Sequence, residues 1–238
     1  MTTLNLGKNY GTEAKFGCTT SLGVAAANTP DAWGGTGADR FCTCNVKEGV
    51  ETYQQDCMFM RFDISSLPAG ATISDATVYL KAKYANANNM VLTIRQFKCN
   101  WGINDNTGYF NNLTENPATH GQATHRRSYD FNGAGGDISW TGGILSVPGD
   151  CSAQSSATTL ASQTADVFYG FGCTVPVNNW YSLGQPNYGV MLWKDTTGTQ
   201  ASTPYFWCDR TATSAPYMVI NYTTTTTNIV LNSMSNTL

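Results

Sequence analysis

The chain has 238 residues and a net charge of −3 at pH 7, and only 12% of its residues are charged, against roughly 25% in an average soluble domain. Its thirteen Lys and Arg residues are scattered, without the basic stripe by which nucleic-acid binders neutralise phosphates. No apolar stretch approaches the ~20 residues that cross a bilayer. These features argue against a nucleic-acid partner and against a membrane anchor.

The first residues, Met1–Gly11, are polar and predict a strand followed by a turn. A secretory signal would instead have a basic start and an apolar core of about 7–15 residues. The low charge and the surplus of Gly, Thr, Asn and Ser are nevertheless typical of extracellular β-proteins. This combination favours a protein that reaches the outside by cell lysis, as a virus particle does.

Short strand patterns follow one another along the chain. The segment Cys57–Ile64 is apolar and rich in β-forming residues, and Ala76–Tyr84 alternates apolar and polar residues as a strand with one wet face does. Further strands are predicted at Met90–Phe97, Tyr188–Trp193, Pro204–Cys208 and Tyr217–Tyr222. Many short strands separated by turns predict an all-β sandwich or barrel.

The middle of the chain gives a weaker pattern. The region 100–175 is rich in Gly, Asn and Ser and predicts long loops over the sheets. No window has a convincing helical stripe, and Ala157–Val167 is the segment that could form a short helix.

Four blocks of this sequence resemble the DNRLRE-type domain, a jelly-roll β-sandwich related to carbohydrate-binding modules of secreted bacterial and archaeal proteins. The blocks are Lys8–Gly11, Met60–Leu80, Trp180–Leu192 and Pro216–Tyr222, in the order of the family. The resemblance implies one jelly-roll domain over residues 1–222, followed by a Thr-rich tail over 223–238.

Within the second block, the turn Leu67–Gly70 contains a proline that presets φ and a glycine that accepts positive φ. The strand near Ala76 is therefore expected to return beside Phe59–Ile64. In the Phe59–Ile64 strand, Phe62 and Ile64 should face the core, with Arg61 and Asp63 on the opposite face.

The tail begins with five threonines, Thr223–Thr227. It is either a frayed terminus or a tether whose strand adds to the sheet edge of a neighbouring subunit. The residues of that strand would be Ile229, Val230 and Leu231.

An even number of cysteines predicts up to four disulfides, with a pairing that the sequence leaves open. Free buried thiols, or a metal site around the Cys-x-Cys motif, are the alternatives. The eight candidates are Cys18, Cys42, Cys44, Cys57, Cys99, Cys151, Cys173 and Cys208.

Catalytic motifs are missing from the sequence, which has no Gly-x-Ser-x-Gly elbow and no phosphate loop. Its two histidines, His120 and His125, are five residues apart in a loop-like run. We therefore expect no enzyme and no cofactor other than a structural calcium ion. That ion would be held by Asn104, Asp105 and Asn106, for which an Asx-rich turn is the alternative.

Tryptophans give the clearest binding signal. Trp180, Trp193 and Trp207 lie in or beside predicted strands and are expected in the core. Trp33, Trp101 and Trp140 lie in loop-like sequence, where they would contact glycans, cap the sandwich or fill a subunit interface.

These observations favour a non-enzymatic structural virion protein, a decoration, cement or head-spike subunit of a bacteriophage. Its partners would be other copies of itself, other virion proteins such as the major capsid protein, and a host polysaccharide. The alternative is a secreted carbohydrate-binding or adhesion module.

Overall fold

The computed structural model describes a set of segments that together contain every strand and helix named below. They are residues 1–7, 10–12, 14–22, 41–43, 45–47, 54–85, 90–100, 127–129, 138–139, 149–152, 156–160, 162–194, 205–207 and 214–224.

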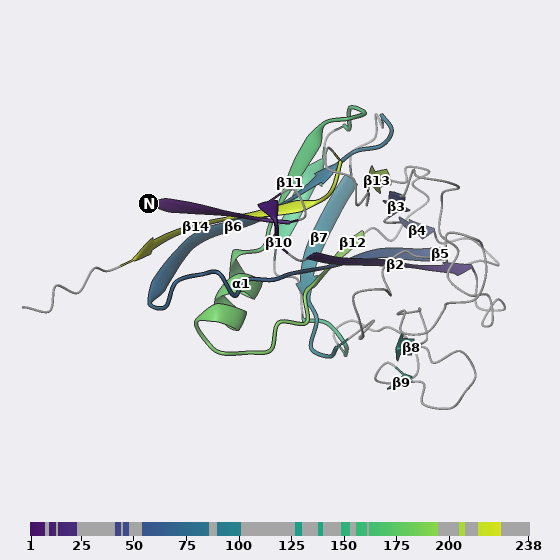
Figure 1. Cartoon of the computed structure of the whole chain (residues 1–238). Coiled ribbons are helices and arrows are strands. Elements are labelled where there is room, and N and C mark those ends of the chain that lie inside the picture. Colours follow the sequence, from purple (N-terminus) through teal and green to yellow (C-terminus); the bar gives the residue numbers. More distant parts are fainter. Residues whose placement is uncertain are drawn as a thin grey trace, which may run out of the picture.

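Two antiparallel sheets account for most of these segments (Figure 1). The four-strand sheet has the order β1 (Thr2–Leu6), β14 (Tyr217–Thr224), β6 (Ala71–Lys81) and β11 (Phe168–Gly172). The six-strand sheet has the order β10 (Ser156–Leu160), β7 (Met90–Gln96), β12 (Val190–Lys194), β5 (Gln54–Phe62) and β2 (Ala14–Leu22), with β4 (Asn45–Lys47) also paired to β5.

Smaller elements complete the described part. Strand β3 (Phe41–Thr43) pairs with β13 (Tyr205–Trp207), and β8 (Arg127–Tyr129) pairs with β9 (Ile138–Ser139). The helix α1 (Thr174–Tyr181) lies beside β6 (Figure 1). Among the described residues there is no helix with both the length and the apolar character that a membrane span requires.

One apolar core fills the space between the two sheets. Alternate residues of strands such as β6 and β14 point into it, as the period of two requires. The four-strand sheet contributes residues such as Val78, Leu80 and Ile220, and the six-strand sheet contributes Met60, Phe62, Ile94 and Leu192. The protein is therefore an all-β sandwich, as the strand patterns predict.

The predicted turn between β5 and β6 forms, but it connects the two sheets. Leu67 N–H donates to the carbonyl of Ile64 at 3.0 Å, and Gly70 has a φ of +75°. The expectation that the next strand returns beside Phe59–Ile64 is wrong, because β6 pairs with β14 and β11 instead. The alternation of apolar and polar residues in β6 suits a strand of either sheet. The sequence pattern therefore does not predict which strands pair with β6.

The predicted faces of the strand that ends at this turn are confirmed. Phe62 is buried and Ile64 packs against the core, whereas Arg61 is partly buried and Asp63 is exposed. Period-two alternation fixes which face a side chain occupies even when the neighbouring strand is unknown.

The region 100–175 holds strands of both sheets as well as connections. The predicted helix over Ala157–Val167 is wrong, because its first residues belong to β10, which pairs with β7. Thr158 and Thr159 are β-branched and favour this extended form. Strand β11 forms an edge of the four-strand sheet, and α1 follows it directly.

Candidate functional site

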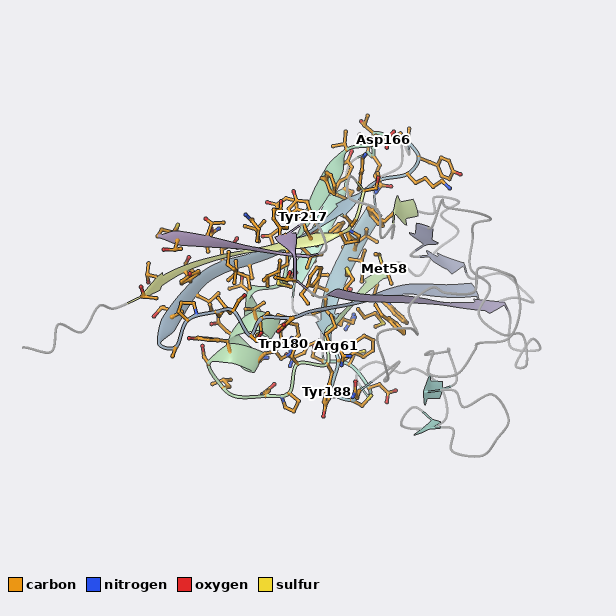
Figure 2. All side chains as sticks on the ribbon, viewed as in Figure 1. Met58, Arg61, Asp166, Trp180, Tyr188 and Tyr217 are labelled. Carbon is orange, nitrogen blue, oxygen red and sulfur yellow. The ribbon has the colours of Figure 1, made fainter. Side chains whose placement is uncertain are left out.

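Four aromatic side chains meet on the outer face of the four-strand sheet: Tyr10, Tyr79, Phe168 and Tyr217, here called the outer aromatic cluster. The rings of Tyr79 and Tyr217 stack, with centroids 4.9 Å apart and an angle of 12° between their planes. Phe168 and Tyr10 each present an edge to Tyr217, at centroid distances of 5.2 and 5.8 Å. Figure 2 shows Tyr217 above the four-strand sheet and Trp180 below it.

Strand register gathers these rings from distant parts of the chain. Tyr79 lies between the buried residues Val78 and Leu80, so it must point away from the core. Tyr217 is its direct partner on β14, and Phe168 lies across from Lys81 on β11. Tyr10 comes from the turn after β1, where its N–H donates to the carbonyl of Gly7 at 2.9 Å.

Glycines make room for the two stacked tyrosines. Gly170 is the partner of Tyr79 on β11, and a Cβ there would lie 3.2 Å from the Tyr79 ring. Gly7 has a φ of +137°, and a Cβ there would lie 3.2 Å from the Cβ of Tyr217. The tyrosine pair is thus flanked on both sides by residues without side chains, which lets the rings lie close to the sheet.

The cluster is apolar in its rings and polar at its rim. Tyr10 is 46% exposed, and Tyr79, Phe168 and Tyr217 are partly exposed. Burial, followed by the neighbouring Tyr10 and Tyr79, raises the pKa of Tyr217, so its phenol stays neutral at physiological pH. At one end, Lys81 forms an ion pair with Asp166 at 3.3 Å.

This arrangement presents aromatic rings and hydroxyl groups suited to binding. Rigid aromatic rings with hydroxyl tips supply a large contact area at low entropic cost, and they are enriched at interfaces. Within the described segments, no group of three or more His, Cys, Asp or Glu side chains is placed to hold a metal ion.

Most residues that the sequence singled out as sites lie outside the described residues. This applies to Trp33, Trp101 and Trp140, to the calcium candidates Asn104, Asp105 and Asn106, and to the tether residues Ile229, Val230 and Leu231. Those predictions therefore stay predictions.

The tryptophans expected in the core are partly accounted for. Trp180 is buried, as predicted, although it belongs to α1 and not to a strand. Trp193 lies in β12 and is partly buried, packed on a second cluster on the other side of the six-strand sheet. Trp207 lies in β13, and its side chain is outside the described part.

The cysteines whose side chains are described are free thiols, which differs from the predicted disulfides. They are Cys99, Cys151 and Cys173. Cys173 is fully buried in the core beside α1, where it acts as a small apolar side chain and burial raises its pKa. Cys99 and Cys151 are near each other without being bonded. Of the remaining candidates, Cys18, Cys42 and Cys57 lie in strands, and Cys44 and Cys208 are outside the described residues.

The sequence did not predict the outer aromatic cluster, because its four rings come from separate segments, the turn after β1 and the strands β6, β11 and β14. The sequence does contain one indication of the cluster: Tyr79 and Tyr217 are aromatic residues at positions expected on the solvent-facing side of their strands. An aromatic on the wet face of a strand is a candidate contact residue.

Comparison with known proteins adds no relative: no family model matches the sequence, and the curated proteins contain no match.

Proposed function

We propose that this chain is a non-enzymatic structural protein of a virus particle, a decoration, cement or head-spike subunit of a bacteriophage. The outer aromatic cluster is its contact surface, against a neighbouring copy or against another virion protein such as the major capsid protein. The single observation that carries the proposal is the set of four solvent-accessible rings that contact one another on the outer face of the four-strand sheet. Large exposed aromatic groups on such a scaffold are typical of interaction sites.

The composition supports a role outside the cell, where a particle is found after lysis. Only 12% of the residues are charged, and the chain is rich in Gly, Thr and Asn. Binding through the cluster would stabilise the shell by mass action, because a ligand that binds only the assembled form favours that form.

The jelly-roll connection is part of the same proposal. The chain passes repeatedly between the two sheets, from β5 to β6 to β7 and from β10 to β11 to β12. Such crossing connections between antiparallel sheets are the pattern of a jelly roll. They support a fold that many capsid proteins use.

The proposal is tested on purified virions and on particles that lack this protein. We expect the chain in virions at a copy number that is a simple multiple of the shell symmetry. The purified chain should rebind depleted particles, and the double variant Tyr79→Ser, Tyr217→Ser should rebind at least tenfold more weakly. Tyr84→Ser is the matched control, because Tyr84 is 49% exposed, lies beyond the end of β6 and is not one of the four residues of the cluster. Absence of the chain from every particle would overturn the proposal.

A secreted carbohydrate-binding or adhesion module is the second candidate. The observation that favours it is the neutral, aromatic character of the cluster, with tyrosine rings and three hydroxyl groups on one surface. Apolar C–H faces of sugars pack on such rings while the hydroxyls exchange hydrogen bonds. Binding on a glycan array that is lost in the Tyr79, Tyr217 double variant and kept in Tyr84→Ser would establish it; no binding to neutral or anionic polysaccharides would exclude it.

A further inference from the structure

Two cysteines meet where the chain leaves β7 and where it returns toward β10. Phe97 and Cys151 form an antiparallel bridge. On either side of it, Lys98 N–H donates to the carbonyl of Asp150 at 2.8 Å, and Ser152 N–H donates to the carbonyl of Gln96 at 2.7 Å. The two passing segments are thus held in a fixed register.

This register puts both thiols on one face. Cys99 is two residues beyond Phe97, just past the end of β7, and it packs on the same apolar cluster as Cys151, which is directly across from Phe97. The two cysteines are therefore diagonal neighbours, for which Cα atoms are about 7–8 Å apart and Cβ atoms closer. A disulfide needs Cα atoms within about 6.8 Å, which is slightly shorter than the usual spacing of diagonal neighbours, so closing the bond requires the two segments to move slightly closer together.

The surroundings favour that approach. Cys151 is buried in a second apolar cluster with Phe59, Phe97 and Met191, and Cys99 packs against the same cluster from a partly exposed position. The Cys99 Sγ–H donates to a carboxylate oxygen of Asp150 at 3.9 Å. Cys99 is also one of the groups that raise the pKa of Cys151, as is expected of thiols that lie close together.

We propose that Cys99 and Cys151 form a redox-active pair, which closes into a disulfide when the protein meets an oxidising environment. The bond would fasten the end of β7 to the start of the β10 segment and would close residues 100–150 into a covalent loop. The inference does not depend on the proposed function, since this pair would close in any oxidising environment, whatever the role of the protein there.

The reaction needs an oxidant, for which a small disulfide such as oxidised glutathione is sufficient. The Cys99 thiolate attacks one sulfur of oxidised glutathione, forms a mixed disulfide and releases the first glutathione thiolate. The Cys151 thiolate then attacks the Cys99 sulfur and displaces the second. The two cysteines lose two protons and two electrons in all, and oxidised glutathione becomes two molecules of glutathione. Cys99 is the entry point because it is the more exposed of the two.

Peptide mapping of the wild-type chain tests the pair directly. The purified full-length protein is oxidised with oxidised glutathione at pH 9, blocked with N-ethylmaleimide and digested with Asp-N and trypsin. Cys99 is then in the peptide 99–104, Cys151 in 150–165 and Cys173 in 166–194. We expect 99–104 linked to 150–165, with Cys173 alkylated after denaturation. Alkylated Cys99 and Cys151, or a bond from either one to another cysteine, would overturn the proposal.

Variants add a second readout. Oxidation should raise the Tm of the wild type by roughly 5–10 °C, because the long loop restricts the unfolded chain, and dithiothreitol should reverse the rise. Cys99→Ser should abolish the rise, and Cys173→Ala is the matched control that should keep it. An equal rise in Cys99→Ser would contradict the proposal, and the wild-type map decides the matter if that variant does not fold.

Discussion

Tyr79 on β6 and Tyr217 on β14 are register partners whose rings stack 4.9 Å apart on the outer face of the four-strand sheet. Tyr217 is the centre of the cluster, because the rings of Tyr10 and Phe168 also contact it in T-shaped arrangements. One side chain therefore links the turn after β1 to two strands of the sheet. Its removal should affect stability as well as binding.

Tyr217→Ser is expected to lower the free energy of unfolding by about 2 kcal/mol, since it removes three ring contacts worth roughly 0.5–1.5 kcal/mol each, partly offset by their exposure. Urea denaturation followed by circular dichroism measures the loss. Tyr84→Ser, which leaves the cluster intact, should cost less than about 1 kcal/mol. Equal losses in the two variants would show that the stacked pair contributes nothing specific.

Asn187→Ala should destabilise the fold where the segment before β12 contacts the end of β5. The Asn187 Nδ2 donates to the carbonyl of Phe62 at 2.8 Å, and its Oδ1 accepts from the N–H of Gly189 at 3.1 Å. The loss of both hydrogen bonds should lower the free energy of unfolding by about 2 kcal/mol in urea denaturation. Asn187→Asp keeps the acceptor for Gly189 but places a carboxylate oxygen against the Phe62 carbonyl, so at neutral pH it should be no more stable than the alanine variant.

Gly189→Ala should be far more damaging than Gly184→Ala, although both glycines have positive φ, +87° and +64°. A Cβ at Gly189 would lie 2.2 Å from the carbonyl oxygen of Met60, whereas a Cβ at Gly184 would meet open space. We expect a loss above about 3 kcal/mol, or no folded protein, for Gly189→Ala and about 1–2 kcal/mol for Gly184→Ala. Comparable stabilities of the Gly189→Ala and Gly184→Ala variants would mean that β5 and the segment before β12 separate easily at Gly189.

Alkylation of Cys99 should accelerate with pH. Burial, followed by the charge of Asp150 and a hydrogen bond to it, raises the pKa of Cys99 to about 11. Since only the thiolate reacts, the rate with iodoacetamide in the native Cys151→Ala variant should rise about tenfold per pH unit from 7 to 10. Asp150→Asn removes the nearby negative charge and should react faster at each pH. A plateau near pH 8.5 would show that the thiol is not perturbed.

Stability should decline above about pH 9 for the same reason. Burial raises the pKa of Cys151 and Cys173, as it does that of Cys99, so each thiol stays protonated in the folded state after it has ionised in the unfolded chain. The unfolded state then binds fewer protons, and each such thiol lowers the free energy of unfolding by at most about 1.4 kcal/mol per pH unit. Urea titrations at pH 7, 9 and 10 under reducing conditions measure this slope, and Cys173→Ala should make it shallower.

Local sequence was sufficient to find most strands but not their partners. The alternation around Ala76 predicted a strand and its buried face correctly, because those depend on successive residues of one segment. The pairing of β6 with β14 depends on residues about 140 positions apart in the sequence, and the turn at Leu67–Gly70 says only that the chain bends.

Helix α1 shows the other limit. It has eight residues, no acidic residue in its first turn, no basic residue in its last and no side-chain cap. Pro176 in the first turn is compatible with a helix and was the one positive signal. The helix is stabilised by the burial of Val177 and Trp180 and by Tyr181, whose hydroxyl accepts from Ala71 N–H at 2.9 Å. Tertiary packing of this kind cannot be read from a short window.

The pairing of β1 with β14 has a mechanical consequence. Thr2 lies across from Tyr222, so the beginning of the first strand and the end of the last one emerge at the same end of the sheet. A force that pulls these two ends apart loads the hydrogen bonds between the strands one pair at a time, starting at Thr2, and peels β1 away from β14. The sandwich would therefore yield at low force when it is stretched by its ends, and it would resist better when it is loaded through its faces.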